Sequence, residues 1–142
     1  MKNEKDLLTS LYKNASMGTS SIAAILPRVQ NPQLCQELEA QLDRYQESCR
    51  TLRQKLPKDK NFTGLHQKTS EFYAKSSIRL STLLDSSSSH VAELMIQGTN
   101  MGVIEISKAL NTDKDAPPKL KEDAAAMLKR EQQYIDKLKY YL

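Results

Sequence analysis

The sequence predicts a single all-α domain, an antiparallel four-helix bundle over residues 1–142. Glycine and proline are scarce, at 4 and 5 residues, and helix-forming residues are plentiful, which favours helices over strands joined by tight turns. Apolar residues recur in steps of three and four along four segments, as they do on one face of a helix. The chain is long enough for one core and short for two ordinary domains.

The first helix is predicted over about residues 3–26. Pro27 disfavours continuation, because proline lacks the amide hydrogen that the helix needs. Asn31 and Pro32 then provide an N-cap and a first-turn proline, and Pro57 ends the second helix. The short connection predicts antiparallel neighbours. The predicted core residues of these two helices are Leu8, Leu11, Ala15, Gly18, Ile22, Ile25, Val29, Leu38, Leu42, Tyr45, Cys49, Leu52 and Leu56.

The third helical region follows a predicted loop over residues 58–64, and its continuity is ambiguous. Periodicity crosses residues 85–89 without a phase jump, which favours one long helix over about residues 65–110. The four serines of that segment compete for backbone hydrogen bonds, and Asp85 or Ser86 could cap a new helix. A single helix would overhang the others and would imply an oligomer. The predicted core residues are Leu65, Phe72, Ile78 or Leu80, Leu84, Val91, Leu94, Gly98 and Met101.

A turn rich in Asp, Asn and Pro at residues 111–118 precedes the fourth predicted helix. The apolar stripe of this helix is predicted to consist of Leu120, Ala124, Met127, Glu131, Tyr134, Leu138 and Tyr141. Small residues in the first and third helices, Gly18, Gly98 and Gly102, are expected to let helix backbones approach closely.

Glu131 stands out because it falls on this apolar stripe. A buried carboxylate without a partner costs several kcal/mol, so it needs a hydrogen bond or a place near solvent. The sequence predicts a hydrogen bond to Tyr45, to Tyr134 or to a side chain of the third helix. Binding to a metal or to a small ligand is the alternative.

A complete di-metal site in a helical bundle requires inward carboxylates and two Glu-x-x-His pairs. The closest matches are Asp43-x-x-Gln46 and Glu131-x-x-Tyr134, which lack the histidine, and His90-x-x-Glu93, in which the order is reversed. The candidate metal ligands are therefore Asp43, His90, Glu93 and Glu131.

Other function classes find little support. The sequence contains no glycine-rich phosphate loop and no Gly-x-Ser-x-Gly motif, which argues against an enzyme. The net charge is +4, but 21 basic residues are interspersed with 17 acidic ones, and aromatic stacking platforms are missing, which argues against nucleic-acid binding. Cys35 and Cys49 lie about 21 Å apart on one predicted helix and cannot pair within it.

A cytoplasmic location is expected. The sequence holds no apolar run long enough for a transmembrane segment, and its N-terminus lacks the pattern of a signal peptide.

Four segments carry a resemblance to a known family. Leu-Tyr-Lys-Asn-Ala-x-Met-Gly at 11–18, Gln-Leu-Asp-x-Tyr at 41–45, the run from Asp85 to Gly98, and Met-Gly-Val at 101–103 resemble a family of uncharacterised small helical proteins from clostridia and related bacteria. That family is similar to ferritin-like and rubrerythrin-like bundles. The resemblance implies a ferritin-like bundle with iron-handling ancestry and degenerate metal ligands.

These observations predict a non-enzymatic, cytoplasmic helical protein that acts through self-assembly or protein partners and needs no cofactor. The alternative is a ferritin-like metal-binding or redox protein with a reduced ligand set, using iron or another transition metal. A homo-oligomer or a protein partner is expected.

Overall fold

A computed structural model describes residues 6–57, 75 and 77–142. These residues form helices and connecting segments, with no strand among them. The long helices are α1 (Leu7–Ile25), α2 (Pro32–Lys55), α4 (Ser88–Thr112) and α5 (Pro118–Leu138), and two short 3-10 helices are η1 (Leu26–Arg28) and η2 (Lys139–Tyr141). In this part of the chain, no helix combines the length and apolar character needed to cross a membrane.

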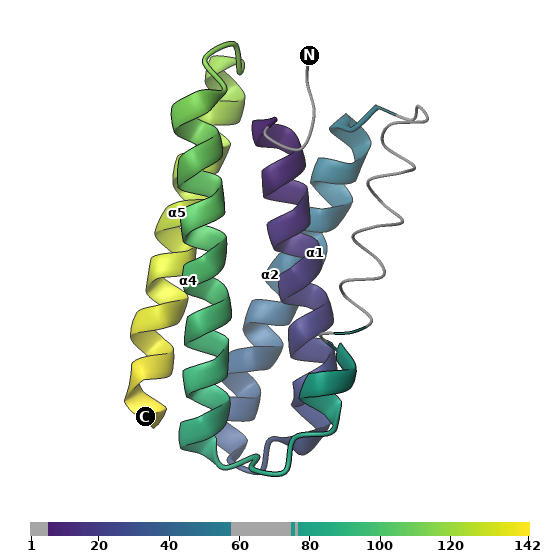
Figure 1. The fold of residues 1–142 in the computed structure, drawn as a ribbon, viewed down its shortest axis with the longest axis vertical. Helices are drawn as coiled ribbons and strands as arrows, with labels where there is room; N and C mark the ends of the chain where they lie inside the picture. The colour runs from purple at the N-terminus through teal and green to yellow at the C-terminus, as the bar shows by residue number, and fades with distance from the viewer. Residues whose placement is uncertain (1–5, 58–74, 76) are drawn as a thin grey trace.

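The long helices pack as two antiparallel pairs (Figure 1). α1 lies against α2, α4 lies against α5, and α1 also contacts α4. The connection from α2 to α4 therefore returns the chain to the end of the molecule at which α2 begins. The all-α prediction is confirmed.

Side-chain caps fix where the helices begin. The carboxylate of Asp6 accepts a hydrogen bond from the amide of Leu8 at 2.9 Å, and the Asn31 side chain accepts from the amides of Gln33 and Leu34. Each cap satisfies amides that have no partner inside the helix. The helix start predicted at Asn31 and Pro32 is confirmed.

The third helical region is interrupted before α4. Residues 77–81 are helical, residues 83–87 are not, and α4 begins after Ser87, whose hydroxyl accepts a hydrogen bond from the amide of His90 at 3.3 Å. The carboxylate of Asp85 accepts from the amide of Ser87, and this bond lowers the pKa of Asp85. Of the two alternatives left open by the sequence, the interrupted form is therefore observed, with Ser87 as the cap, and the single helix that would have implied an oligomer is not. The predicted loop at 58–64 and residues 65–74 lie outside the described residues, as does the predicted start of the first helix.

The side chain of Arg28 ties the segment before α4 to the first helical pair. The guanidinium of Arg28, in η1, donates to the carbonyl oxygen of Ser81 at 2.8 Å and to that of Leu83. These bonds fix the end of the connection against the turn between α1 and α2.

A second long-range bond joins the two helical pairs at the opposite end. The carboxylate of Asp113, at the C-cap of α4, accepts a hydrogen bond from the amide of Leu7 at 3.1 Å. Asp113 is buried. Its hydrogen bond satisfies an amide in the first turn of α1, which has no partner inside the helix.

The predicted core is largely correct for α1, α2 and α5 and wrong for part of α4. On α4 the buried side chains are those of Val91, Ala92, Met95, Ile106 and Ala109, whereas Met101, predicted to be in the core, is 62% exposed. Gly98 is exposed as well. α4 carries apolar residues on two neighbouring sides, and the side that contains Val91, Met95 and Ile106 packs inward.

Candidate functional site

The predicted partner of Glu131 is confirmed. The Glu131 side chain is 1% exposed. The hydroxyl of Tyr45 donates to Oε2 at 2.6 Å, and the amide of Asn14 donates to Oε1 at 3.0 Å. The contact from Tyr45 has the length of a strong hydroxyl-to-carboxylate hydrogen bond. Both oxygens of the buried carboxyl group are therefore satisfied.

All four long helices contribute to this buried polar cluster, which we define as Asn14, Tyr45, Thr99 and Glu131. α4 supplies Thr99, whose hydroxyl donates to the carbonyl oxygen of Met95 at 2.8 Å and whose side chain acts to lower the pKa of Tyr45. The ring of Tyr134 packs edge-on against the ring of Tyr45, with centroids 5.6 Å apart. A polar group in the core that has partners on several helices favours one relative alignment of those helices.

Burial dominates the titration of the cluster. Desolvation raises the pKa of Glu131, and the hydrogen bonds from Tyr45 and Asn14 offset part of this effect. Desolvation and the nearby Glu131 carboxylate also raise the pKa values of Tyr45 and Tyr134. Glu131 therefore keeps its proton to higher pH than an exposed glutamate does.

The raised pKa of Glu131 predicts a pH-dependent stability. Above the ordinary pKa of 4.5 the unfolded chain loses a proton that the folded chain retains, so the free energy of unfolding falls as pH rises through the folded-state pKa. Urea titrations of wild type and Glu131→Gln between about pH 4 and pH 8 should show this decline in the difference between the two. A difference that is independent of pH, or that grows in favour of wild type with pH, would contradict it.

Two glycines provide the space for the cluster. A Cβ atom on Gly18 would lie 2.6 Å from the ring of Tyr45, and one on Gly102 would lie 2.0 Å from Oδ1 of Asn14. The expectation from the sequence is a close approach of helix backbones, whereas the space beside these two glycines is filled by the side chains of Tyr45 and Asn14. Gly98 differs, because a Cβ atom there would meet nothing within 4 Å.

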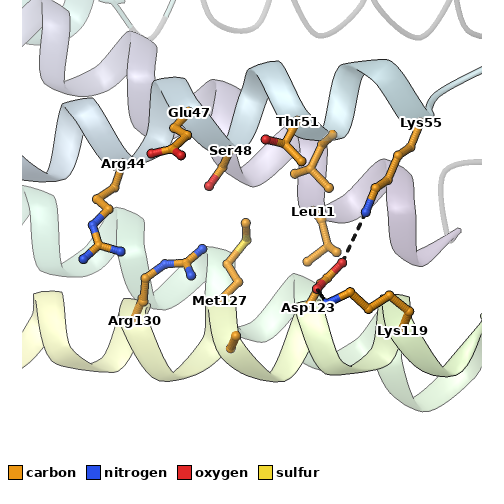
Figure 2. A pocket seen from close by; sticks show the side chains of 12 residues that line it. Leu11, Arg44, Glu47, Ser48, Thr51, Lys55, Lys119, Asp123, Met127 and Arg130 are labelled. Carbon is orange, nitrogen blue, oxygen red and sulfur yellow. Dashed lines mark hydrogen bonds and ion pairs between the residues drawn. The ribbon is translucent and has the colours of Figure 1, made fainter.

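A groove of about 370 Å³ runs between α2 and α5 (Figure 2). Both helices line it, and Leu11 of α1 lies at its back. Its lining residues are Leu11, Arg44, Glu47, Ser48, Thr51, Leu52, Lys55, Lys119, Asp123, Ala126, Met127 and Arg130. Its volume falls within the range of small-molecule sites.

Charged side chains lie at both ends of the groove. At one end, Asp123 lies 3.3 Å from the amino groups of both Lys55 and Lys119. At the other end, Arg44 extends from α2 and Arg130 from α5 into the gap (Figure 2). Among the described residues, neither guanidinium has a carboxylate within ion-pair distance.

The groove does not open onto Glu131. A narrow gap beneath it is lined by Tyr45, Glu131 and Tyr134 together with groove residues, but it has no room for a water molecule. The buried polar cluster and the groove are thus neighbouring but separate features.

The four candidate metal ligands occupy different environments. Glu131 lies in the core, Asp43 is exposed on α2, and Glu93 is exposed on α4. Nδ1 of His90 lies 3.5 Å from Oε1 of Glu93, as in a surface pair one helical turn apart. Within the part of the chain that the structure describes, no group of three or more His, Cys, Asp or Glu side chains could hold a metal ion.

Several residues of both features were not predicted from the sequence. Asn14 carries no charge and lies beside the apolar stripe of α1, so only its position near Glu131 reveals its role. Arg44 and Arg130 resemble the other basic residues of the surface until the packing of α2 and α5 brings them to one groove. Comparison of the chain with protein-family models, curated proteins and solved structures found no match.

Proposed function

We propose that this chain is a non-enzymatic, cytoplasmic protein of ferritin-like four-helix-bundle design that acts by assembling with further copies of itself or with protein partners. Two antiparallel helix pairs joined by a long connection support the bundle arrangement. The resemblance to clostridial helical proteins stays a prediction.

The observation that carries the proposal is the second apolar stripe of α4. Met101 and Ile104 are 62% and 46% exposed and lie one helical turn apart. Gly98 lies one turn before Met101, with open space around the position of a Cβ atom. We name Gly98, Met101 and Ile104 the outer face of α4. Two apolar side chains beside a glycine offer a partner helix both a contact and a recess.

A second copy of the chain is the partner that this face suits best. A two-fold axis would bring the same patch of both subunits together, so the apolar residues of one copy meet those of the other. The glycine would let the two backbones approach. α4 has 25 residues and is about 38 Å long, which provides length for an interface of about 800 Å² on each partner.

The lack of access to Glu131 supports a non-enzymatic role. This carboxyl group is the most strongly buried acid of the core, and an acid or base in catalysis must reach a substrate atom. Both of its oxygens already accept hydrogen bonds from side chains, and the gap beside it admits no water molecule.

Light scattering at micromolar concentration tests the proposal. We expect an oligomer for wild type and a monomer for Met101→Ser/Ile104→Ser, because the double substitution removes the apolar contact without touching the core. Ile78→Ser is the matched control, since Ile78 is also 62% exposed and lies outside α4.

Either of two results would overturn the self-assembly proposal: a wild-type protein that is strictly monomeric, or an oligomer whose mass is unchanged by the double substitution. Circular dichroism of each variant shows whether it keeps the helical fold, so dissociation can be separated from unfolding.

A second proposal is a ferritin-like protein that binds iron or another transition metal through a reduced ligand set. It is favoured by Glu131, a buried carboxyl group reached by side chains of α1 and α2. Metal binding there would have to displace Tyr45 or Asn14. Elemental analysis of protein purified without chelator or affinity metal tests it. Near-stoichiometric metal that is lost in Glu131→Gln and kept in Asp43→Asn would support a site at Glu131, and a metal-free protein would exclude it.

A further inference from the structure

We propose that the groove between α2 and α5 binds a small elongated molecule that carries a phosphate or carboxylate group, with the anionic group held between Arg44 and Arg130. The groove lies on α2 and α5, whereas the outer face of α4 serves the assembly proposed above. The two proposals therefore use different surfaces and can fail separately.

The first argument is the convergence of two guanidinium groups from different helices. Arg44 extends from α2 and Arg130 from α5 into the same end of the groove (Figure 2). Guanidinium groups present several fixed donors that match the oxygens of a phosphate or carboxylate.

The second argument is that the two arginines have no carboxylate partner. No ion pair within 4.0 Å joins either of them to an acidic residue in the described part of the chain. Glu47 is the acidic side chain at this end of the groove. The hydroxyl group of Ser48 lies between the arginines and the middle of the groove (Figure 2) and provides a neutral donor for an anion.

The lysines at the opposite end of the groove already have a carboxylate partner. Asp123 lies 3.3 Å from the amino groups of Lys55 and of Lys119, so the positive charges there face a carboxylate of the protein. We therefore expect the anionic group to bind beside the two arginines, which have no ion-pair partner, in preference to the lysines that already face Asp123.

The middle of the groove favours an apolar body attached to the anionic group. Leu11, Leu52 and Met127 are among the lining residues and are almost fully buried, so they form an apolar floor against which a hydrocarbon chain or an aromatic ring could lie. Two ion pairs cross between α2 and α5, Lys55 with Asp123 and Lys137 with Glu37. The groove thus combines two arginines at one end with an apolar floor.

Titration with phenyl phosphate, followed in ¹H–¹⁵N NMR spectra, tests the proposal. Inorganic phosphate and phenol serve as the anionic and the apolar part alone, all at constant ionic strength. We expect saturable shifts around residues 44–52 and 126–130, with phenyl phosphate binding more tightly than either part. Shifts that are scattered over the surface, no shift at about 10 mM, or equal binding of phenol would overturn the proposal.

Charge-matched variants separate a built site from general attraction. Arg44→Gln and Arg130→Gln should each weaken phenyl phosphate binding at least about tenfold, since each removes charge-assisted hydrogen bonds. The controls Arg50→Gln on α2 and Lys129→Gln on α5 remove the same charge from exposed positions outside the groove. They should change the affinity less than about twofold. An equal loss in the controls would show non-specific attraction only and would overturn the proposal.

Discussion

Glu131→Ala is expected to lower the free energy of unfolding by about 3 kcal/mol. The substitution leaves the hydroxyl of Tyr45 and the amide of Asn14 without their acceptor in the core. It also leaves a cavity where the side chain lay, because a packed core collapses only in part. For a chain of 142 residues, this loss corresponds to a fall of roughly 10 °C in the melting temperature.

Glu131→Gln is the control for this prediction. Glutamine has nearly the same shape as glutamate. Its side-chain oxygen can accept from the hydroxyl of Tyr45, and its NH2 group can donate to the side-chain oxygen of Asn14 once the Asn14 amide has flipped. We expect a cost of about 1 kcal/mol or less. Urea unfolding at one pH, monitored by circular dichroism, measures both variants. Equal stability of the alanine and glutamine variants would show that the hydrogen bonds of the cluster contribute nothing.

Gly18→Ala is expected to destabilise the protein by about 2 kcal/mol, although alanine is the better helix former by about 1 kcal/mol. The new Cβ atom would lie 2.6 Å from two ring atoms of Tyr45 and 2.8 Å from a third. This ring cannot move aside easily, since its hydroxyl is bonded to Glu131 and its edge packs against Tyr134. The substitution therefore strains the buried polar cluster as a whole.

Gly98→Ala provides a matched comparison. It makes the same change in the interior of a helix, but the new Cβ atom meets nothing within 4 Å. We expect it to stabilise the fold by about 0.5 to 1 kcal/mol. Because Gly98 belongs to the outer face of α4, both glycine variants should be measured in a Met101→Ser/Ile104→Ser background. A stabilising Gly18→Ala would contradict the close packing on Tyr45.

The positions of α1, α2 and α5 could be predicted from local signals. Asn31 and Pro32 start α2, and Pro57 follows its end. The apolar steps of three and four on α5 placed Glu131 in the core correctly, because a helix that is apolar on one side has one choice of inward face. These signals, namely caps, prolines and apolar periodicity, all act within a single helix.

The inward face of α4 could not be predicted in the same way. This helix has apolar residues on two neighbouring stripes, so periodicity alone does not determine which one is buried. The buried side depends on packing against the other helices: Val91, Met95 and Ile106 lie in the core, and the side chain of Asn14 fills the space beside Gly102. The spacing of Met101 predicts a core position, but its side chain lies at the surface. The prediction is wrong because periodicity does not show which side of α4 packs inward.

The candidate site was predictable in part. Glu131 and its partner Tyr45 follow from the cost of an unpaired carboxylate on an apolar stripe. Arg44 and Arg130 are separated by most of the chain, and their convergence depends on how α2 and α5 rotate against each other. Periodicity in a single sequence does not predict how α2 and α5 are rotated about their axes, so the groove is visible only in the structure.

The hydrogen bond between Leu7 and Asp113 couples the beginning of α1 to the turn between α4 and α5. The two residues are 106 positions apart, so a nascent chain that has released only α1 and α2 from the ribosome still lacks the carboxylate that completes the first turn of α1. The N-terminal turn can reach its final form only after the loop before α5 has been synthesised. The first turn of α1 is therefore synthesised early, but its hydrogen bond to Asp113 forms late.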